Sequence, residues 1–213
     1  MEPQKKNVTY TTIRPVGIKI IKYLSTKNEL DENIFHSSIY LLDYLFIQKK
    51  YVNDIKKTAI ACVIIMTKFK GEGVKAKMLE REMISNIKEF SYNDIEQNIL
   101  KVVDYKLNFV TVFDIMNDVL HKGIIFIDEN TRMIDKIYLS CLVQLNAIVE
   151  NKISLNYKQT DIVFSIIAFT RELYGMEDRS YVFDELYGVT YDRKCLTEIK
   201  KRTHVKKCKS IGN

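Results

Sequence analysis

The sequence is poor in the residues that interrupt regular structure. Its 213 residues include only 7 glycines and 2 prolines. Sandwiches and barrels need frequent turns, which are usually built on glycine and proline, so this composition argues against both architectures. Long helices joined by short loops fit the composition better. Hydrophobic residues make up 46% of the chain and charged residues 28%, as in an ordinary packed protein.

Signals for membranes, secretion and metal binding are also missing. No apolar run approaches the roughly 18 residues of a membrane span, and the first six residues have no apolar core of a signal peptide. The four cysteines form no C-x-x-C pair and have no histidine at zinc-ligand spacing. We therefore expect an intracellular protein of the nucleus or cytoplasm, with no membrane partner, no metal and no cofactor.

Catalytic signatures are absent as well. The sequence contains no P-loop, no dinucleotide-binding glycine pattern, no nucleophile elbow and no kinase signature. Carboxylates such as Glu80 and Glu82 have the spacing of solvated surface charges. These absences favour an interaction protein over an enzyme, and we expect no small-molecule substrate. An enzyme on a helical bundle remains a third hypothesis, for which the sequence offers no nucleophile, base or metal set.

Apolar periodicity predicts five helices in the first half of the chain. We expect the first to run from about Pro15 to Leu24 and the second to follow an Asp31 cap. The fifth is expected to follow Ser91, where Asp94 stands at the spacing of a capping box.

Two apolar runs stand about 100 residues apart. Residues 59–66 are all apolar, and residues 162–169 are apolar except for Ser165. The first run could be a buried strand, but apolar residues extend the pattern beyond strand length, so we predict a helix surrounded by other helices. Matching runs in the two halves indicate a degenerate internal repeat with a boundary near residues 108–111. One irregular helical domain is the alternative.

The net charge of +6 would suit an acidic partner or a nucleic acid. The basic residues are scattered except near the C-terminus, at residues 200–209. Such a tail is usually solvated, and a role in nuclear import or phosphate contacts is the alternative.

Three stretches of the chain resemble the cyclin family. Residues 34–46 (IFHSSIYLLDYLF) are similar to the second helix of the cyclin box, and residues 59–69 (AIACVIIMTKF) to the third. Residues 96–120 resemble the fifth helix and the segment after it. The likeness is weaker in the second half but extends over roughly residues 14–203.

The resemblance implies an all-α fold of two tandem cyclin-fold repeats of five helices, each around a buried central helix. The expected parts are an N-terminal extension, a first cyclin box, a second repeat and a basic tail, over residues 1–13, 14–109, 110–203 and 204–213.

The resemblance also implies a regulatory subunit that binds and activates a cyclin-dependent protein kinase, with roles in the cell cycle or in transcription. In the family, a lysine and a glutamate that match Lys68 and Glu96 bind near the regulatory helix of the kinase, beside an apolar surface. The matching apolar residues here are Phe69, Leu100, Tyr105 and Leu107. Arg14 and Asp43 match a structural salt bridge between the first two helices.

The first helix departs from the family pattern. The residues Ile13-Arg14-Pro15-Val16-Gly17 stand where the family's substrate-docking motif begins, and Ile20 takes the place of a tryptophan. We therefore expect no docking of Arg-x-Leu substrate motifs.

A protein resembling transcription factor IIB is the second hypothesis. That family uses the same two repeats to bind promoter DNA and the TATA-binding protein, and the positive charge would suit DNA. No N-terminal zinc ribbon is visible, and the Lys68–Glu96 pair would have no role, so we do not expect a nucleic-acid partner.

Overall fold

Helices make up all the regular secondary structure in the part of the chain that the structure describes. The computed structural model describes residues 8–49, 54–86, 91–122, 131–176, 185, 188 and 192–210, and no strand occurs among them. These residues form two compact units that divide between Thr111 and Val112. In the described ranges, no helix combines the length and the apolar character that a bilayer span needs.

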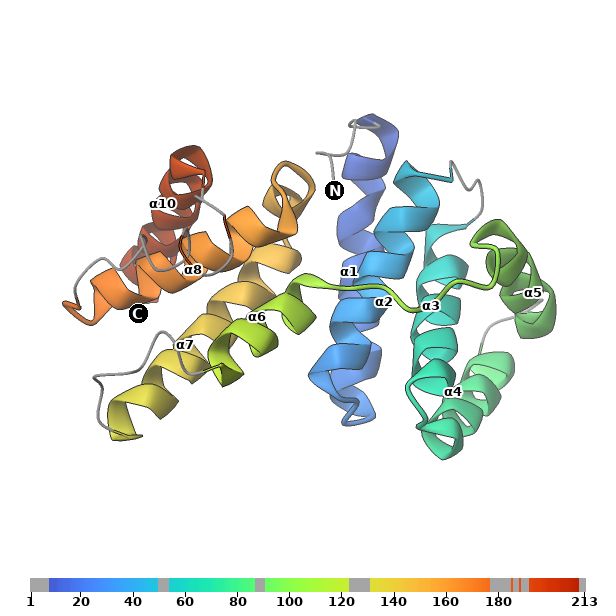
Figure 1. The fold of residues 1–213 in the computed structure, drawn as a ribbon. Coiled ribbons are helices and arrows are strands. Elements are labelled where there is room, and N and C mark those ends of the chain that lie inside the picture. Colours follow the sequence, from blue (N-terminus) through green and yellow to red (C-terminus); the bar gives the residue numbers. More distant parts are fainter. Residues whose placement is uncertain are drawn as a thin grey trace. The chain divides into compact units, whose positions relative to one another are not determined.

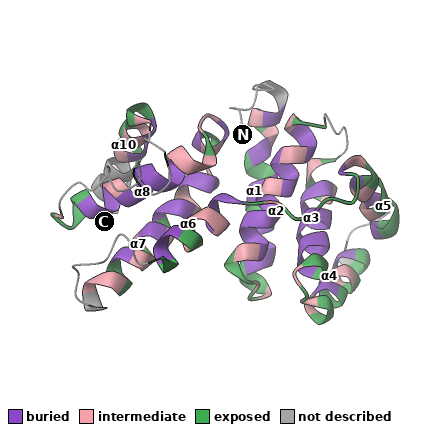
Figure 2. Cartoon of the chain, viewed as in Figure 1, coloured by how far each residue is buried: buried purple, intermediate pink, exposed green. Residues whose placement is uncertain are grey.

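The first unit is built around its third helix. That helix, α3, contacts each of the other four, and Figure 1 shows it between α2 and α4. Every residue from Thr58 to Thr67 is buried (Figure 2), as predicted for a helix surrounded by others. The helices of this unit are α1 (Val8–Lys27), α2 (Glu32–Ile47), α3 (Ile55–Phe69), α4 (Gly73–Asn86) and α5 (Tyr92–Val102).

Side-chain caps fix where two of these helices begin. The carboxylate of Asp31 accepts a hydrogen bond from the Asn33 amide at 2.7 Å, which confirms the predicted cap of α2. Asp54 caps α3 in the same way. The predicted capping box of α5 is wrong, because the Ser91 hydroxyl bonds to the Asp94 carboxylate and makes no side-chain cap to the backbone.

Helix α1 begins earlier than the sequence predicts. It starts at Val8 and carries Pro15 in its interior, whereas we expected the helix to begin at Pro15. Proline removes one hydrogen bond inside a helix and weakens it there. Tyr10 and Arg14, both buried, bond to Asp43 of α2 and hold the first turns of α1 against the unit. Part of the segment expected as an N-terminal extension therefore belongs to the packed first unit.

Gly17 allows α1 to approach its neighbours closely. A Cβ atom at this position would lie 2.7 Å from Leu42 Cδ2 and 3.3 Å from the side chain of Ile55. Because Leu42 is fully buried on α2, a larger residue would force it aside. The absence of a side chain at Gly17 thus sets the distance between α1 and the rest of the unit.

The second unit is packed around the second apolar run. Helix α8 contacts α6, α7 and α10, and residues Ile162–Ile167 are buried, which confirms the predicted buried helix. The sequence also predicts a short helix that carries Val182, Phe183, Leu186 and Tyr187, and these four residues lie outside the described ones. The helices of this unit are α6 (Val112–His121), α7 (Thr131–Val149), the 3₁₀ turn η1 (Lys152–Leu155), α8 (Gln159–Leu173) and α10 (Arg193–Ser210).

Candidate functional site

The structure brings Lys68 and Glu96 together, although 28 residues separate them in the chain. Lys68 lies in the last turn of α3 and Glu96 in the second turn of α5. The Lys68 ammonium donates to both carboxylate oxygens of Glu96, at 3.2 and 3.3 Å. Since α3 and α5 pack directly against each other, the backbone fixes where both side chains start.

Two further side chains surround the Lys68 ammonium. Glu80 of α4 places a carboxylate oxygen 3.5 Å from it, and the ring centre of Tyr92 lies 4.4 Å from it, within the range of a cation–π interaction. The hydroxyl of Tyr92 also donates to Glu96 at 2.6 Å. Lys68 is therefore held by groups from α4 and α5, and we name these four residues the lysine cluster.

The charges of the lysine cluster are accessible to a binding partner. The exposed fractions of the side chains are 36% for Lys68, 20% for Glu96 and 24% for Glu80. Ion pairs at such exposure contribute only about 0.2–1 kcal/mol to folding, because water screens them and ordering long side chains costs entropy. The arrangement therefore adds little to the stability of the unit.

Burial separates Tyr92 from the three charged members. Its side chain is 1% exposed, and burial, with the hydrogen bond to Glu96 and the charges of Glu96 and Glu80, raises the pKa of its hydroxyl well above the ordinary value. The hydroxyl therefore stays protonated at physiological pH and remains a hydrogen-bond donor to Glu96.

The apolar residues predicted beside the pair differ in exposure. Phe69 is 45% exposed, Tyr105 is 67% exposed and Leu100 is half-buried. Leu107 differs from the expectation: it is only 8% exposed, because the chain after α5 turns this side chain into the core of the first unit. Leu107 therefore supports the surface from below and offers little area for contact.

A strained turn presents Tyr105 to solvent. Asp104 and Tyr105, directly after α5, have φ angles of 54° and 57°, in the left-handed region that non-glycine residues rarely adopt. The Tyr105 amide donates to the Leu100 carbonyl at 2.8 Å and closes the end of α5. Backbone strain of this kind persists where the surrounding structure enforces it, and it is frequent at binding sites.

The Arg14–Asp43 pair is buried, in contrast to the lysine cluster. The guanidinium of Arg14 makes two hydrogen bonds to the carboxylate, at 2.7 and 2.8 Å, and Tyr10 adds a third at 2.6 Å. Burial alone would lower the pKa of Arg14, but the Asp43 carboxylate raises it above the ordinary value. With only 2% of the Arg14 side chain exposed, the pair joins α1 to α2 and is not available to a partner.

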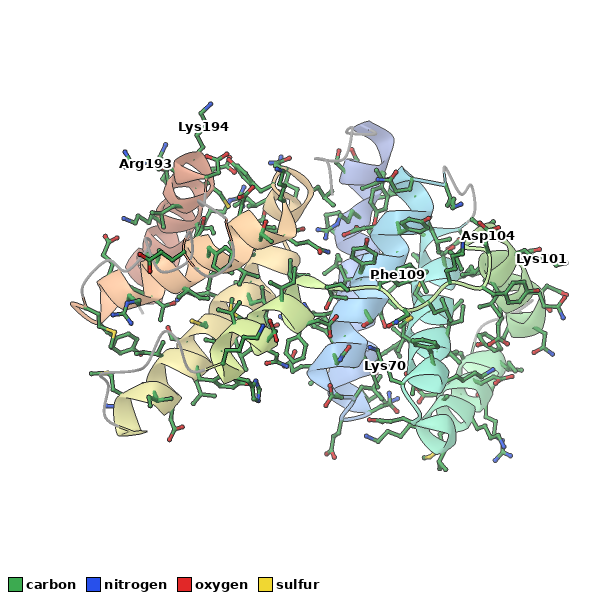
Figure 3. The ribbon with its side chains drawn as sticks, in the orientation of Figure 1. Lys70, Lys101, Asp104, Phe109, Arg193 and Lys194 are labelled. Carbon is green, nitrogen blue, oxygen red and sulfur yellow. The ribbon has the colours of Figure 1, made fainter. Side chains whose placement is uncertain are left out.

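An aromatic cluster that we did not predict fixes the segment after α5. Figure 3 shows Phe109 in front of α2, where its ring centre lies 5.0 Å from that of Tyr40 and 5.6 Å from that of Tyr44. The spacing of Tyr40 and Tyr44 is the sequence signal that could have suggested it, because residues four apart share one face of a helix.

Two of the four members of the lysine cluster were missed at the level of sequence. We interpreted Glu80 as a solvated surface charge, yet it stands four residues after the buried Ala76, on a face of α4 that turns toward the unit. Tyr92 precedes Glu96 by four residues on α5, a spacing that places the two side chains on one face. Among the described residues, no group of histidine, cysteine and carboxylate side chains could hold a metal ion.

Comparison with known proteins identifies the family. The family model "Cyclin, N-terminal domain" matches residues 1–108, half of the chain. A viral cyclin from herpesvirus saimiri has a similar structure: its TM-score is 0.68, its identity 16%, and the match covers 90% of this chain and 84% of that one. At this identity, the likeness speaks for the fold alone. A search of curated proteins gave no match.

The helical units, the buried central helices and the comparisons agree. The fold is the all-α cyclin fold predicted from the sequence. Since a cyclin domain spans half of the sequence and the remainder continues the same fold, the chain belongs to the cyclin family of regulatory proteins.

Proposed function

We propose that this cyclin is a non-catalytic subunit that binds and activates a cyclin-dependent protein kinase through the face that carries the lysine cluster. The observation that carries the proposal is the contact of Lys68 with Glu96 at 3.2 Å, with both side chains partly exposed. Such a subunit acts where its kinase acts, in the nucleus or the cytoplasm.

The chemistry of this face suits a protein partner. Phe69 and Tyr105 expose 45% and 67% of their surface beside the ends of α3 and α5. Aromatic side chains around a few polar groups are typical of the residues that contribute most to binding energy in protein interfaces. The lysine supplies donors and the carboxylates supply acceptors, so the face can bind both carbonyl and amide groups of a partner.

Activation follows if the face binds only one arrangement of the kinase. Phosphoryl transfer requires the glutamate of the kinase regulatory helix to pair with the lysine that binds ATP. A rigid surface that binds the helix only in that position shifts the kinase population toward the active state, by as much as its preference for that state. The packing of α3 against α5 suits this role, because it fixes the backbone from which Lys68 and Glu96 extend.

A pulldown with the full chain tests the proposal. We expect a kinase that phosphorylates histone to be recovered from cell extract with the wild-type chain and to be absent with Glu96→Lys, in which the charge that pairs with Lys68 is reversed. Glu82→Lys is the matched control, because Glu82 forms a surface ion pair with Lys27 at 2.5 Å and is not a member of the lysine cluster. Equal kinase recovery with both variants would refute the proposal.

Lys68→Ala separates a binding role from a structural one. We expect kinase recovery to be lost while the free energy of unfolding changes by less than about 1 kcal/mol, because the ion pairs of Lys68 are partly exposed. A variant that unfolds instead would assign Lys68 to the support of the core and would contradict the proposal.

Binding to DNA, as in the second hypothesis, gives a different outcome in the same preparations. It is favoured by α10, whose sequence contains eight lysines and arginines and one glutamate; Figure 3 shows Arg193 and Lys194 pointing outward from its first turn. A gel shift with duplex DNA that is strong, specific and steeply weakened by salt would support this hypothesis. Recovery of a kinase without such a shift supports the kinase subunit.

A further inference from the structure

Tyr92 links the two halves of the Lys68–Glu96 pair. Its hydroxyl donates to Glu96 at 2.6 Å, while the face of its ring lies 4.4 Å below the Lys68 ammonium. One side chain therefore contacts the carboxylate with its polar end and the cation with its apolar face. Because Tyr92 is buried in the first turn of α5, its own position is fixed by packing.

The charged residues need such support. Lysine loses more rotamer freedom than most side chains when it is held in one place, and at 36% exposure water competes for its ammonium. Without Tyr92, the Glu96 side chain would be held by its attachment to the backbone of α5 and by Lys68 alone among the members of the lysine cluster. A pair of this kind, left alone on a surface, would occupy its binding geometry for part of the time, and a partner would have to order it.

We propose that Tyr92 is a positioning residue, which holds Lys68 and Glu96 in the geometry that the kinase binds before the kinase arrives. This inference rests on the proposed function and adds a role that neither the cyclin pattern in the sequence nor the comparisons assign. Glu80 is the second support, since its carboxylate lies 3.5 Å from the Lys68 ammonium on the side of α4.

The two contacts of Tyr92 have different consequences. The hydrogen bond acts on Glu96 and requires the hydroxyl proton, which the raised pKa of Tyr92 retains. The ring acts on Lys68 and requires only the aromatic face. Tyr92→Phe therefore removes the support of Glu96 and retains that of Lys68, whereas Tyr92→Leu removes both.

Kinase affinity measures the first consequence. The probe is the kinase recovered in the pulldown, purified as a monomer and titrated with each variant. We expect Tyr92→Phe to weaken binding about tenfold, as for the loss of a hydrogen bond to a charged group, and Tyr92→Leu to weaken it further.

Tyr10→Phe is the matched control for folding. Tyr10 is also 1% exposed in the first unit and also donates to a carboxylate at 2.6 Å, but that carboxylate is Asp43, in the buried pair. We expect this variant to lose stability comparable to Tyr92→Phe and to retain wild-type affinity at a temperature where both are folded. Equal affinities for Tyr92→Phe and Tyr10→Phe would overturn the inference.

A second measurement needs no kinase. Nuclear magnetic resonance of lysine side chains labelled with ¹⁵N and ¹³C reports how well the Lys68 ammonium is ordered in the free chain. We expect the order to stay close to that of wild type in Tyr92→Phe, which keeps the ring, and to fall in Tyr92→Leu, with Tyr10→Phe unchanged. Unchanged order of Lys68 in Tyr92→Leu would refute the positioning role. If wild type binds no kinase, the proposed function fails, and this measurement still decides whether Tyr92 positions Lys68.

Discussion

Replacing Asp43 by leucine tests how the first unit is held together. The change removes the carboxylate that accepts two hydrogen bonds from Arg14, at 2.7 and 2.8 Å, and one from Tyr10. The guanidinium, which is 2% exposed in the wild type, loses the carboxylate that pairs with it. Breaking a buried ion pair on one side costs about 3–5 kcal/mol, a large share of the 5–15 kcal/mol of a typical domain.

A double-mutant cycle distinguishes the loss of the pair from the loss of packing. Arg14→Met removes the cation, and the double variant with Asp43→Leu leaves neither charge buried. Since apolar groups of similar volume often replace a buried pair at little cost, we expect the double variant to lose less than the sum of the single variants. The remaining loss, about 1–3 kcal/mol, belongs to the Tyr10 hydroxyl, which no longer has this carboxylate as acceptor.

The assay is urea denaturation of the full chain followed by circular dichroism, since the described residues are helical. We expect the midpoint for Asp43→Leu to fall with an unchanged slope, which indicates lost stability and not a change in the denatured state. If Asp43→Leu lowered the free energy of unfolding by less than about 1 kcal/mol, the reasoning would be refuted, because removing an exposed ion pair has an effect of that size. Additive losses in the cycle would refute it as well.

Three other changes should give measurable effects. Gly17→Ala should lower the free energy of unfolding, measured in urea, by about 1 kcal/mol, because a Cβ atom 2.7 Å from Leu42 Cδ2 overpacks the core by more than the gain in helix propensity. Gly73→Ala should not, because the space around Gly73 is open. Tyr105→Gly should stabilise the fold by about 1 kcal/mol, since it relieves a left-handed residue, yet weaken kinase binding in titrations; wild-type affinity would exclude Tyr105 from the interface. Burial raises the pKa of Tyr10 and Tyr92, so the folded chain keeps a proton on each that the unfolded chain releases above about pH 10. Each of these groups should lower stability there by about 1.4 kcal/mol per pH unit, so Tyr10→Phe should make the slope in urea titrations shallower by that amount.

The helices that carry the fold could be predicted from the sequence because their cause is local. Residues 59–66, and residues 162–169 apart from Ser165, are apolar on every side, which predicts an element that is packed on all sides. For the first run, a pattern longer than a strand then favours a helix. The start of α1 could not be predicted in this way. Pro15 indicates a helix start by its own chemistry, and only contacts of Tyr10 and Arg14 with another helix extend α1 to Val8.

The site shows the same division between local and tertiary causes. The pairing of Lys68 with Glu96 came from a family resemblance, since no spacing rule joins residues 28 apart. Glu80 joins them through the packing of α4 against α3, which the pattern of charges along α4 does not reveal. Leu107 is buried although we expected it on the surface, whereas Tyr105 is exposed as expected. Two left-handed residues, Asp104 and Tyr105, redirect the chain after α5.

Removing either of two chemically similar ion pairs in the first unit thus has different effects, and the exposure of each pair to water determines its effect. The Arg14–Asp43 pair is withdrawn from water, so its loss leaves a buried charge and is felt as unfolding. The pairs of Lys68 are partly solvated, so their loss has little effect on folding. When a kinase covers the lysine cluster, however, its groups become buried in turn, and a missing or reversed charge then costs what it costs in a protein interior. Asp43→Leu should therefore change stability far more than Glu96→Lys, while Glu96→Lys should change kinase affinity far more than stability.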